Sequence, residues 1–239
     1  MVIMDEKLEK DYRNSLEYWE SAYANSQNQN NCEFSASSDW KELAPSEKFI
    51  TALSLFSKCK NLLDYGCGEG WGSIIIAKTG CKNILSVELS ESAVNTTIEK
   101  SKKYKVDEFI KAEKVTADWI NHQESEKYDG FFCSNVIDVV PEEIADNILK
   151  QAYRIIKPNS LAIISLNFYQ DTTLDSNDKF EVKHNYYIYK NGILRMVSRT
   201  DQEWNDIFSK YFSSIKIEHF SWPGETKEPR RLFYLQKKG

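Results

Sequence analysis

Residues 62–72 read Leu-Leu-Asp-Tyr-Gly-Cys-Gly-Glu-Gly-Trp-Gly, and this stretch decides the fold. A short apolar run that ends in an acid predicts a buried strand, and the alternating glycines Gly66, Gly68 and Gly70 predict a tight loop before a helix. Glycine has no Cβ and adopts backbone angles that other residues avoid, so the backbone of such a loop can approach a ligand closely. Ligands of such sheets bind at the carboxyl ends of the strands, which is where this loop lies.

The spacing of the glycines argues against a dinucleotide as the ligand. A dinucleotide-binding loop reads G-x-G-x-x-G or G-x-G-x-x-A. Counted from Gly66, the third small residue would be Trp71, and counted from Gly68 it would be Ser73. Neither register fits, so the loop indicates a nucleotide-like ligand of another kind.

From residue 61 to residue 167 short apolar segments alternate with helical ones. The expected strands cover residues 61–65, 83–88, 113–117, 130–134 and 161–167, and the expected helices cover 72–79, 91–104 and 142–156. This alternation predicts a parallel sheet with helices on both faces, because right-handed crossovers place them there.

The alternation breaks after residue 167. A polar loop at 171–178 precedes two strands, 186–190 and 193–197, that flank Asn191-Gly192, a pair typical of a type I′ hairpin turn. A helix at 201–211, with Thr200 as its N-cap, and strands at 215–220 and 231–235 follow. We therefore expect an α/β fold with a doubly wound, mostly parallel seven-stranded sheet and a β-hairpin inserted after its fifth strand.

The N-terminal sixty residues have a different pattern. Residues 6–23 predict a helix with one apolar stripe, residues 24–38 are polar and predict a loop or hinge, and Pro45-Ser46 open a second helix with Ser46 as its N-cap. We divide the chain into an N-terminal helical lid, residues 1–60, and an α/β domain, residues 61–239, with the inserted hairpin at about 179–198.

Composition limits the possible partners. The chain has 239 residues, of which 41% are hydrophobic, and its formal net charge of −5 argues against nucleic acid as the main partner. No apolar run reaches the length of a membrane span, and the first ten residues lack a signal-peptide core, so the cytoplasm is the expected location. The five cysteines form no CxxC pair and the chain has three histidines, so we expect no metal site. We expect a monomer or a homodimer.

Five sequence landmarks stand in one order along the chain. After the glycine loop, Glu88 closes the second strand, where an acid can accept hydrogen bonds from both ribose hydroxyls. Asp118 and Trp119 follow the third expected strand, residues 128–135 cover the fourth, and Ile-Lys-Pro-Asn-Ser-Leu at 156–161 precedes the fifth. This set resembles the class I S-adenosylmethionine-dependent methyltransferases, whose fold is Rossmann-like, although Asn159-Ser160 replaces the usual pair of glycines.

The resemblance implies S-adenosylmethionine as the cofactor and S-adenosylhomocysteine as its product. It implies that Asp118 bonds the adenine amino group and that Trp119 packs on the ring, although Asp118 could instead cap a helix and Trp119 could belong to the core. The residues expected to bind the cofactor are Asp64, Gly66, Cys67, Gly68, Gly70, Glu88, Leu89, Asp118, Trp119 and Ser134.

The acceptor is expected over the carboxyl ends of the fourth and fifth strands. Methyl transfer needs alignment and exclusion of water, and it needs a base only if the nucleophile must lose a proton. His184 is the first choice for such a base, with a surface histidine as the alternative. The residues expected to bind the acceptor are Tyr12, Trp19, Tyr23, Asn135, Asp138, Asn167, Tyr186 and Arg195.

Three hypotheses about the activity remain from the sequence. Residues 134–137 read Ser-Asn-Val-Ile and lack the Pro-Pro-aromatic motif of enzymes that methylate a flipped DNA base, so a small molecule with an O, N or C nucleophile is the expected acceptor. The second hypothesis is an RNA or protein methyltransferase, which would need a basic groove formed by Lys41, Lys183, Lys190, Arg195 and Arg199. The third is a protein that binds the cofactor without catalysis.

Overall fold

Strand β1 (Leu62–Tyr65) is buried along its whole length in the computed structural model, which describes residues 6–30, 39–172, 180–184 and 186–238. It pairs in parallel with β2 (Ile84–Glu88) on one side and with β4 (Tyr128–Ser134) on the other. The strand order along the chain therefore changes direction at β1. In sheets of this kind, ligands bind in the crevice beside the carboxyl end of the strand where the order reverses.

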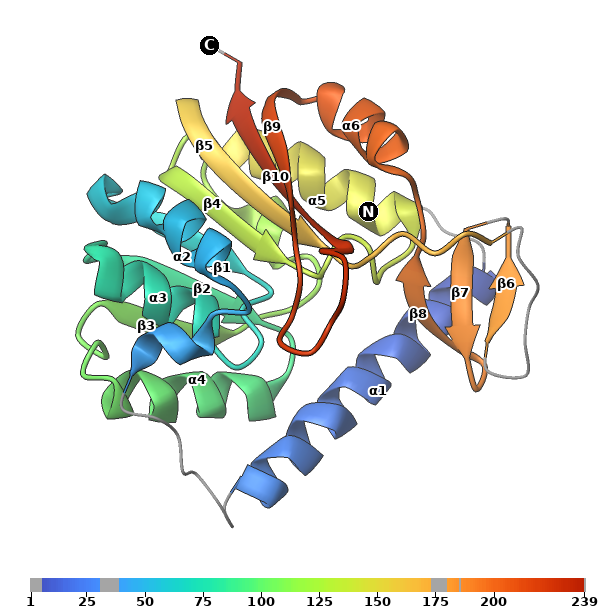
Figure 1. Cartoon of the computed structure of the whole chain (residues 1–239), viewed down its shortest axis with the longest axis horizontal. Coiled ribbons are helices and arrows are strands. Elements are labelled where there is room, and N and C mark those ends of the chain that lie inside the picture. The colour runs from blue at the N-terminus through green and yellow to red at the C-terminus, as the bar shows by residue number, and fades with distance from the viewer. Residues whose placement is uncertain (1–5, 31–38, 173–179, 185, 239) are drawn as a thin grey trace.

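The main sheet has seven strands in the order β3-β2-β1-β4-β5-β10-β9 (Figure 1). Strands β3 (Ile110–Lys114) and β5 (Ile156–Leu166) continue the parallel arrangement. Strand β10 (Arg230–Lys237) runs antiparallel both to β5 and to β9 (Phe212–Phe220). This arrangement confirms the predicted α/β fold with a mostly parallel seven-stranded sheet.

Two apolar cores lie on opposite faces of the sheet because successive side chains of a strand point to opposite sides. Phe132 packs with residues of α2 (Glu47–Ser54) and α3 (Trp71–Thr79), whereas Phe131 packs with residues of α5 (Glu142–Ile155) and α6 (Asp201–Ser209). The remaining helix beside the sheet is α4 (Glu91–Lys103), and short 3₁₀ turns occur at η1 (Trp40–Leu43), η2 (Leu55–Lys58) and η3 (Trp119–His122). None of the described helices is both long and apolar enough to cross a membrane.

A small antiparallel sheet is inserted between β5 and α6. It consists of β6 (Glu181–Lys183), β7 (Tyr187–Lys190) and β8 (Ile193–Val197). The turn between β7 and β8 has positive φ at Asn191 and Gly192, 53° and 73°, as the Asn-Gly pair predicts for a type I′ turn. The insertion is therefore a hairpin with one additional strand, β6, and residues 173–179 and 185 lie outside the described residues.

Helix α1 (Glu6–Asn30) is longer than the expected helix at 6–23. The prediction of a loop at 24–38 is wrong for residues 24–30, and residues 31–38 lie outside the described part of the chain. Residues 24–30 lack an apolar stripe, but they contain no glycine or proline, so nothing in their backbone ends the helix. In Figure 1, α1 extends from the small sheet to α4, across the carboxyl ends of the parallel strands.

Two further local expectations are corrected by the structure. The third strand covers 110–114 rather than 113–117, because Ile110 and Ala112 pair in register with Ile84 and Ser86 of β2. Ser46 precedes α2 as expected, but its side chain accepts no hydrogen bond from the helix. Thr200, in contrast, caps α6 in a complete capping box with Glu203.

Replacing Thr200 with alanine should lower the free energy of unfolding by about 1 kcal/mol. The Thr200 hydroxyl accepts a hydrogen bond from the Glu203 N–H (3.3 Å), and the Glu203 carboxylate accepts one from the Thr200 N–H (2.7 Å). Urea unfolding followed by circular dichroism measures the change. Thr51→Ala, on the exposed side of α2, is the control and should shift stability by no more than about 0.5 kcal/mol; equal effects of the two substitutions would contradict the role of the cap.

Candidate active site

The glycine loop follows β1 and is fixed against the end of β2. The N–H groups of Gly66 and Cys67 both donate to the Val87 carbonyl, at 2.9 and 3.1 Å. Gly66 has φ of +71°, and a Cβ at this position would lie 2.3 Å from the Val136 side chain. A Cβ at Gly68 (φ +52°) would lie 3.0 Å from the hydroxyl oxygen of Tyr23. The loop therefore needs glycine both to turn and to keep the space in front of it open.

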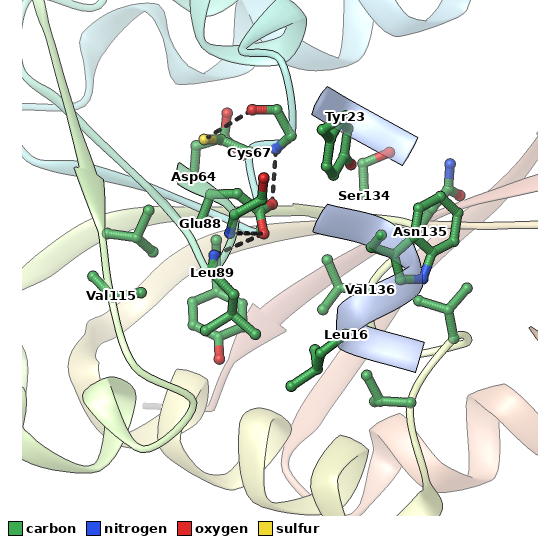
Figure 2. Close-up of a pocket in the computed structure, with 18 of the residues that line it drawn as sticks. Leu16, Tyr23, Asp64, Cys67, Glu88, Leu89, Val115, Ser134, Asn135 and Val136 are labelled. Carbon is green, nitrogen blue, oxygen red and sulfur yellow. Dashed lines mark hydrogen bonds between the residues drawn. The ribbon is translucent and has the colours of Figure 1, made fainter. Parts of the chain in front are cut away.

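Glu88, at the end of β2, joins the loop to the following turn (Figure 2). One carboxylate oxygen accepts a hydrogen bond from the Gly68 N–H (3.0 Å), and the other accepts one from the Leu89 N–H (2.7 Å). Burial raises the pKa of Glu88, and the hydrogen bonds from the Gly68, Leu89 and Ser90 N–H groups only partly oppose this. The carboxylate also lines the cavity beside the loop.

Asp64, at the end of β1, is almost fully buried beneath the loop. The Ser73 hydroxyl donates a hydrogen bond to it at 2.5 Å, and Ser73 also contacts the Ser86 hydroxyl at 2.6 Å. Burial raises the pKa of Asp64 to about 7, although the hydrogen bond from Ser73 works in the opposite direction. Asp64 therefore exchanges its proton near neutral pH at the base of the cavity.

A cavity of about 660 Å³ opens in front of these residues. Its walls come from the glycine loop, the ends of β2, β3 and β4, and one side of α1 (Figure 2). Seven residues expected to bind the cofactor line it: Asp64, Gly66, Cys67, Gly68, Glu88, Leu89 and Ser134. Four residues expected to bind the acceptor line it as well: Tyr12, Trp19, Tyr23 and Asn135. The structure thus brings both predicted groups to one cavity.

Three residues expected to bind the cofactor do not line this cavity. Gly70 precedes α3 and packs near Thr97. Trp119 packs against the core that contains Phe131. The Asp118 side chain is 65% exposed, and its carboxylate accepts a hydrogen bond from the Thr116 hydroxyl (2.5 Å) and lies 3.2 Å from the His122 ring nitrogen. Local partners thus hold Asp118 away from the position that the resemblance implied.

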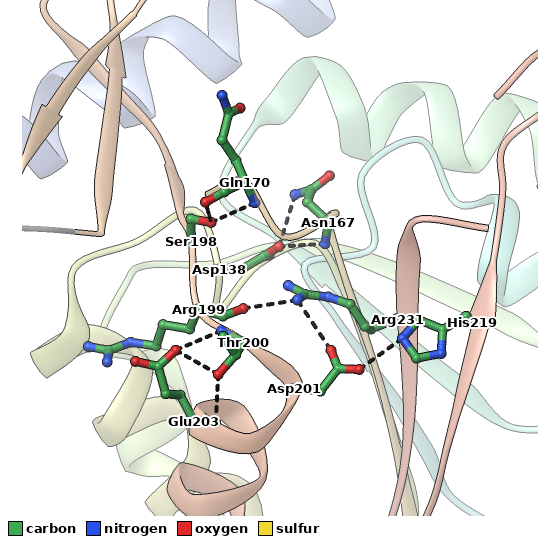
Figure 3. Close-up of polar contacts among 10 residues, drawn as sticks. All are labelled: Asp138, Asn167, Gln170, Ser198, Arg199, Thr200, Asp201, Glu203, His219 and Arg231. Carbon is green, nitrogen blue, oxygen red and sulfur yellow. Dashed lines mark hydrogen bonds and ion pairs between the residues drawn. The ribbon is translucent and has the colours of Figure 1, made fainter. Parts of the chain in front are cut away.

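Asp138 and Asn167 do not line the cavity, and Figure 3 shows them hydrogen-bonded to each other. The fully buried Asp138 carboxylate accepts hydrogen bonds from the Asn167 backbone N–H (2.6 Å) and side-chain amide (3.0 Å). The Asp138 carbonyl accepts a further bond from the Val197 N–H (2.7 Å). These two residues tie the loop after β4 to the ends of β5 and β8, so their contacts are structural.

The remaining residues expected near the acceptor belong to the small sheet and its flanks. Tyr186 donates a hydrogen bond to Glu142, and the Arg195 guanidinium lies over the Tyr18 ring at 3.9 Å. His184 is exposed, has φ of +52°, and contacts Tyr187 edge-on with 5.8 Å between the ring centroids. None of Tyr186, Arg195 and His184 lines the cavity, so the structure does not bring His184 to the site where a general base would act.

Sequence reasoning missed several lining residues. Ser15, Glu17 and Glu20 line the cavity from α1, and Val136, Val139 and Val140 line it from the loop after β4. Glu20 lies one position from Trp19 and three from Tyr23, so helical periodicity could have placed it near the lining side of α1. The valines carry no such signal, because an apolar run after a strand equally predicts core.

The comparisons with known proteins agree with this geometry. A model of the methyltransferase domain family matches residues 62–159. An uncharacterized protein of Rickettsia prowazekii (strain Madrid E) is 36% identical over 109 residues, which cover 44% of this chain and 42% of that protein, so the similarity spans less than half of either chain.

Solved structures extend the likeness in fold to the rest of the chain. The 1,6-didemethyltoxoflavin-N1-methyltransferase of Burkholderia thailandensis, with its substrate and S-adenosylhomocysteine bound, superposes with a TM-score of 0.69 at 12% identity, covering 97% of this chain and 91% of that one. The N-methyltransferase NodS of Bradyrhizobium japonicum, bound to S-adenosylhomocysteine, gives a TM-score of 0.57 at 13% identity, with coverages of 81% and 87%.

Residues 62–159 thus match a methyltransferase domain, and the sheet order and the glycine loop agree with the class I S-adenosylmethionine-dependent methyltransferases that the sequence resembles. S-Adenosylmethionine is the methyl donor of this class of enzyme, and S-adenosylhomocysteine is the product that remains after transfer.

Glu88→Ala should weaken the binding of S-adenosylhomocysteine by about 1–3 kcal/mol, because the ribose hydroxyls lose a charged hydrogen-bond acceptor. Asp118→Ala should leave the affinity unchanged, since its exposed carboxylate lies outside the cavity. Isothermal titration calorimetry of both variants measures the difference. Equal losses in the two variants would show that Asp118 reaches the cofactor, and an unchanged Glu88 variant would remove Glu88 from the ribose site.

Asp64→Asn should flatten the pH dependence of stability between pH 4 and pH 7. The folded-state pKa of Asp64, about 7, lies above the value of about 4 for an unfolded chain. The folded state therefore binds more protons in this window, and the Asp64 contribution to the free energy of unfolding falls as the pH rises. Urea unfolding at several pH values tests this, with the exposed Asp107→Asn as control; an unchanged slope for Asp64→Asn would contradict the assignment.

Proposed function

We propose that this protein transfers a methyl group from S-adenosylmethionine to a small-molecule acceptor with an O, N or C nucleophile. The observation that carries the proposal is the position of α1. Tyr12, Trp19 and Tyr23 on this helix line the same cavity as the glycine loop, so one cavity offers room for a donor and an acceptor side by side. A volume of about 660 Å³ falls in the range of roughly 300–1,000 Å³ typical of small-molecule sites.

The end of the cavity beside the glycine loop fits the donor. Gly66 and Gly68 leave room that a Cβ would fill, and Glu88 presents a carboxylate suited to the ribose hydroxyls. Asp64 and Ser134 line the same end of the cavity. When bound there, S-adenosylmethionine supplies an electrophilic methyl carbon, and the chain contributes its position and direction.

The other end of the cavity fits an apolar or aromatic acceptor. Leu16 and Trp19 of α1 face the same space as Val136, Val139 and Val140 of the loop after β4. These side chains exclude water, which favours a displacement between two bound molecules. Asn135, with φ of +54°, also lines the cavity and offers an amide for orienting the acceptor.

The charges around the cavity do not support a polymer acceptor. Among the residues that line it, Lys114 is the only cation, while five are carboxylates: Glu17, Glu20, Asp64, Glu69 and Glu88. Three of the five basic residues considered for an RNA groove have other contacts, since Arg199 pairs with Glu142 (2.8 Å), Lys183 pairs with Glu181 (3.3 Å) and Arg195 stacks on Tyr18. RNA binding would need a basic surface beside the cavity.

The similar structures add support of a general kind. The Burkholderia thailandensis enzyme acts on 1,6-didemethyltoxoflavin, a small molecule, and its structure covers nearly the whole of this chain. Its fold likeness includes the N-terminal part and the insertion, which in this chain contribute α1 and the small sheet. A non-catalytic protein would have no need of an apolar space beside the donor site, so we favour an enzyme.

We also propose that α1, within the N-terminal segment of residues 1–60, acts as a lid over the α/β domain formed by residues 61–239, whereas α2 of that segment packs in the core of the sheet. Helix α1 contacts both β8 and α4, and its aromatic side chains close one side of the cavity. Entry of the donor would require this helix to move. We assign no general base, because His184 is exposed and outside the cavity, and alignment alone can support transfer to a nucleophile that carries no proton to lose.

S-Adenosylmethionine with a radioactive methyl group should label the small-molecule fraction of a cell extract and leave RNA and protein unlabelled. The small size of the cavity and its excess of carboxylates are the physical reason for this expectation. The enzyme is incubated with the separated fractions, and the transferred label is counted, with Glu88→Ala as the matched control of low donor affinity. Label in RNA or protein would replace the small-molecule proposal, and no transfer into any fraction would favour a binding protein.

A further inference from the structure

Glu88 of β2 contacts the turn that follows this strand, and Glu20 of α1 contacts the first turn of α4 that comes directly after it. The Ser92 hydroxyl donates a hydrogen bond to Glu20 at 3.1 Å, and the Ser90 N–H lies 3.4 Å from a Glu88 carboxylate oxygen. Both carboxylates line the cavity next to Leu89. The two acids therefore reach one side of the cavity from elements that are 68 positions apart in the sequence.

The charge of Glu20 also acts on Glu88. The hydroxyl of Ser90 and then that of Ser92 lower the pKa of Glu20, as does the charge of Lys114, so Glu20 is ionised at neutral pH. The charge of Glu20 in turn adds to the burial that raises the pKa of Glu88. Like charges repel, so the charge of Glu20 disfavours ionisation of Glu88 when α1 is docked on the domain.

A vicinal diol would relieve this repulsion. The ribose carries two adjacent hydroxyls, and each can donate one hydrogen bond to a carboxylate. Hydrogen bonds to an ionised acceptor are the stronger ones, so a diol between two carboxylates gains two favourable contacts where the empty site has a repulsion.

We propose that Glu20 is a second ribose-binding residue, so that the cofactor fastens α1 over the cavity. The inference rests on the proposed function, because it takes the ribose of the methyl donor as the ligand. The same helix carries Trp19 and Leu16 to the acceptor end of the cavity. On this proposal the bound donor adds a contact that holds α1 over the acceptor end, and the product, which keeps the ribose, retains that contact until it leaves.

Calorimetry with S-adenosylhomocysteine and its 2′-deoxy and 3′-deoxy analogues tests the role of Glu20. Glu20→Gln should bind S-adenosylhomocysteine about tenfold more weakly than the wild type. Against one of the two deoxy analogues, the one that lacks the hydroxyl facing Glu20, the variant should bind about as well as the wild type. Glu9→Gln is the matched control on the same helix, since the exposed Glu9 pairs only with Arg13 in the described contacts.

Hydrogen exchange of the α1 backbone amides gives a second measurement, which does not depend on enzymatic activity. In the wild type and in Glu9→Gln, S-adenosylhomocysteine should slow exchange across residues 12–25. In Glu20→Gln that protection should be largely lost at equal occupancy of the site. Glu20→Asp, which keeps the charge but shortens the side chain, should lie between the two and serves as the second variant if Glu20→Gln does not fold.

The outcomes separate this inference from the proposed function. If the wild type does not bind S-adenosylhomocysteine, the proposed function fails and takes the inference with it. If the wild type binds and the Glu20 variants match it against all three ligands, the inference is overturned and the proposed function stands. An equal loss for S-adenosylhomocysteine and both analogues would also overturn it, because that pattern marks a structural role.

Discussion

The hydrogen bond from the Gly68 N–H to the Glu88 carboxylate holds the glycine loop at the end of β2, and the cofactor site is built around it. The loop can reach this position only because Gly66 has no side chain where Val136 approaches from the neighbouring strand end. Parallel pairing of β1 with β2 and β4 brings these three strand ends to one edge. The shape of the cavity beside the glycine loop is therefore set by the backbone of the loop and of these strand ends, which tolerates few substitutions.

The acceptor end obeys a different constraint, because it depends on how α1 lies across the strand ends. Tyr189 of β7 donates a hydrogen bond to Asp11 (2.8 Å), and Ser15 donates one to the Leu194 carbonyl (3.1 Å). These contacts anchor the first half of α1 on the inserted sheet, and the contact between Glu20 and Ser92 holds its second half on α4. This side of the cavity is thus formed by segments far apart in the sequence, α1 and the loop after β4, which meet only in the folded state.

This difference explains how much the sequence could predict. The strand, loop and helix around Gly66 and the turn at Asn191-Gly192 were predictable, because glycine and asparagine report the backbone angles that those few residues need. The direction of Asp118 was not, because Thr116 and His122 compete for its carboxylate within the same short segment. The distance of His184 from the cavity depends on the docking of the whole inserted sheet, for which no local pattern exists.

Asp138 and Asn167 lie at the strand ends where the sequence places them, but their polar groups make contacts within the protein. These groups bond to each other and to the β8 end. Burying a carboxylate is costly unless it is hydrogen-bonded, and these bonds fix the loop that carries Val136, Val139 and Val140. The polar residues Asp138 and Asn167 thus set the shape of this wall, and the apolar valines face the cavity. Under the proposed function, a change of acceptor would fall on the apolar side chains of α1 and of this loop, while the donor site and the buried Asp138 stay as they are.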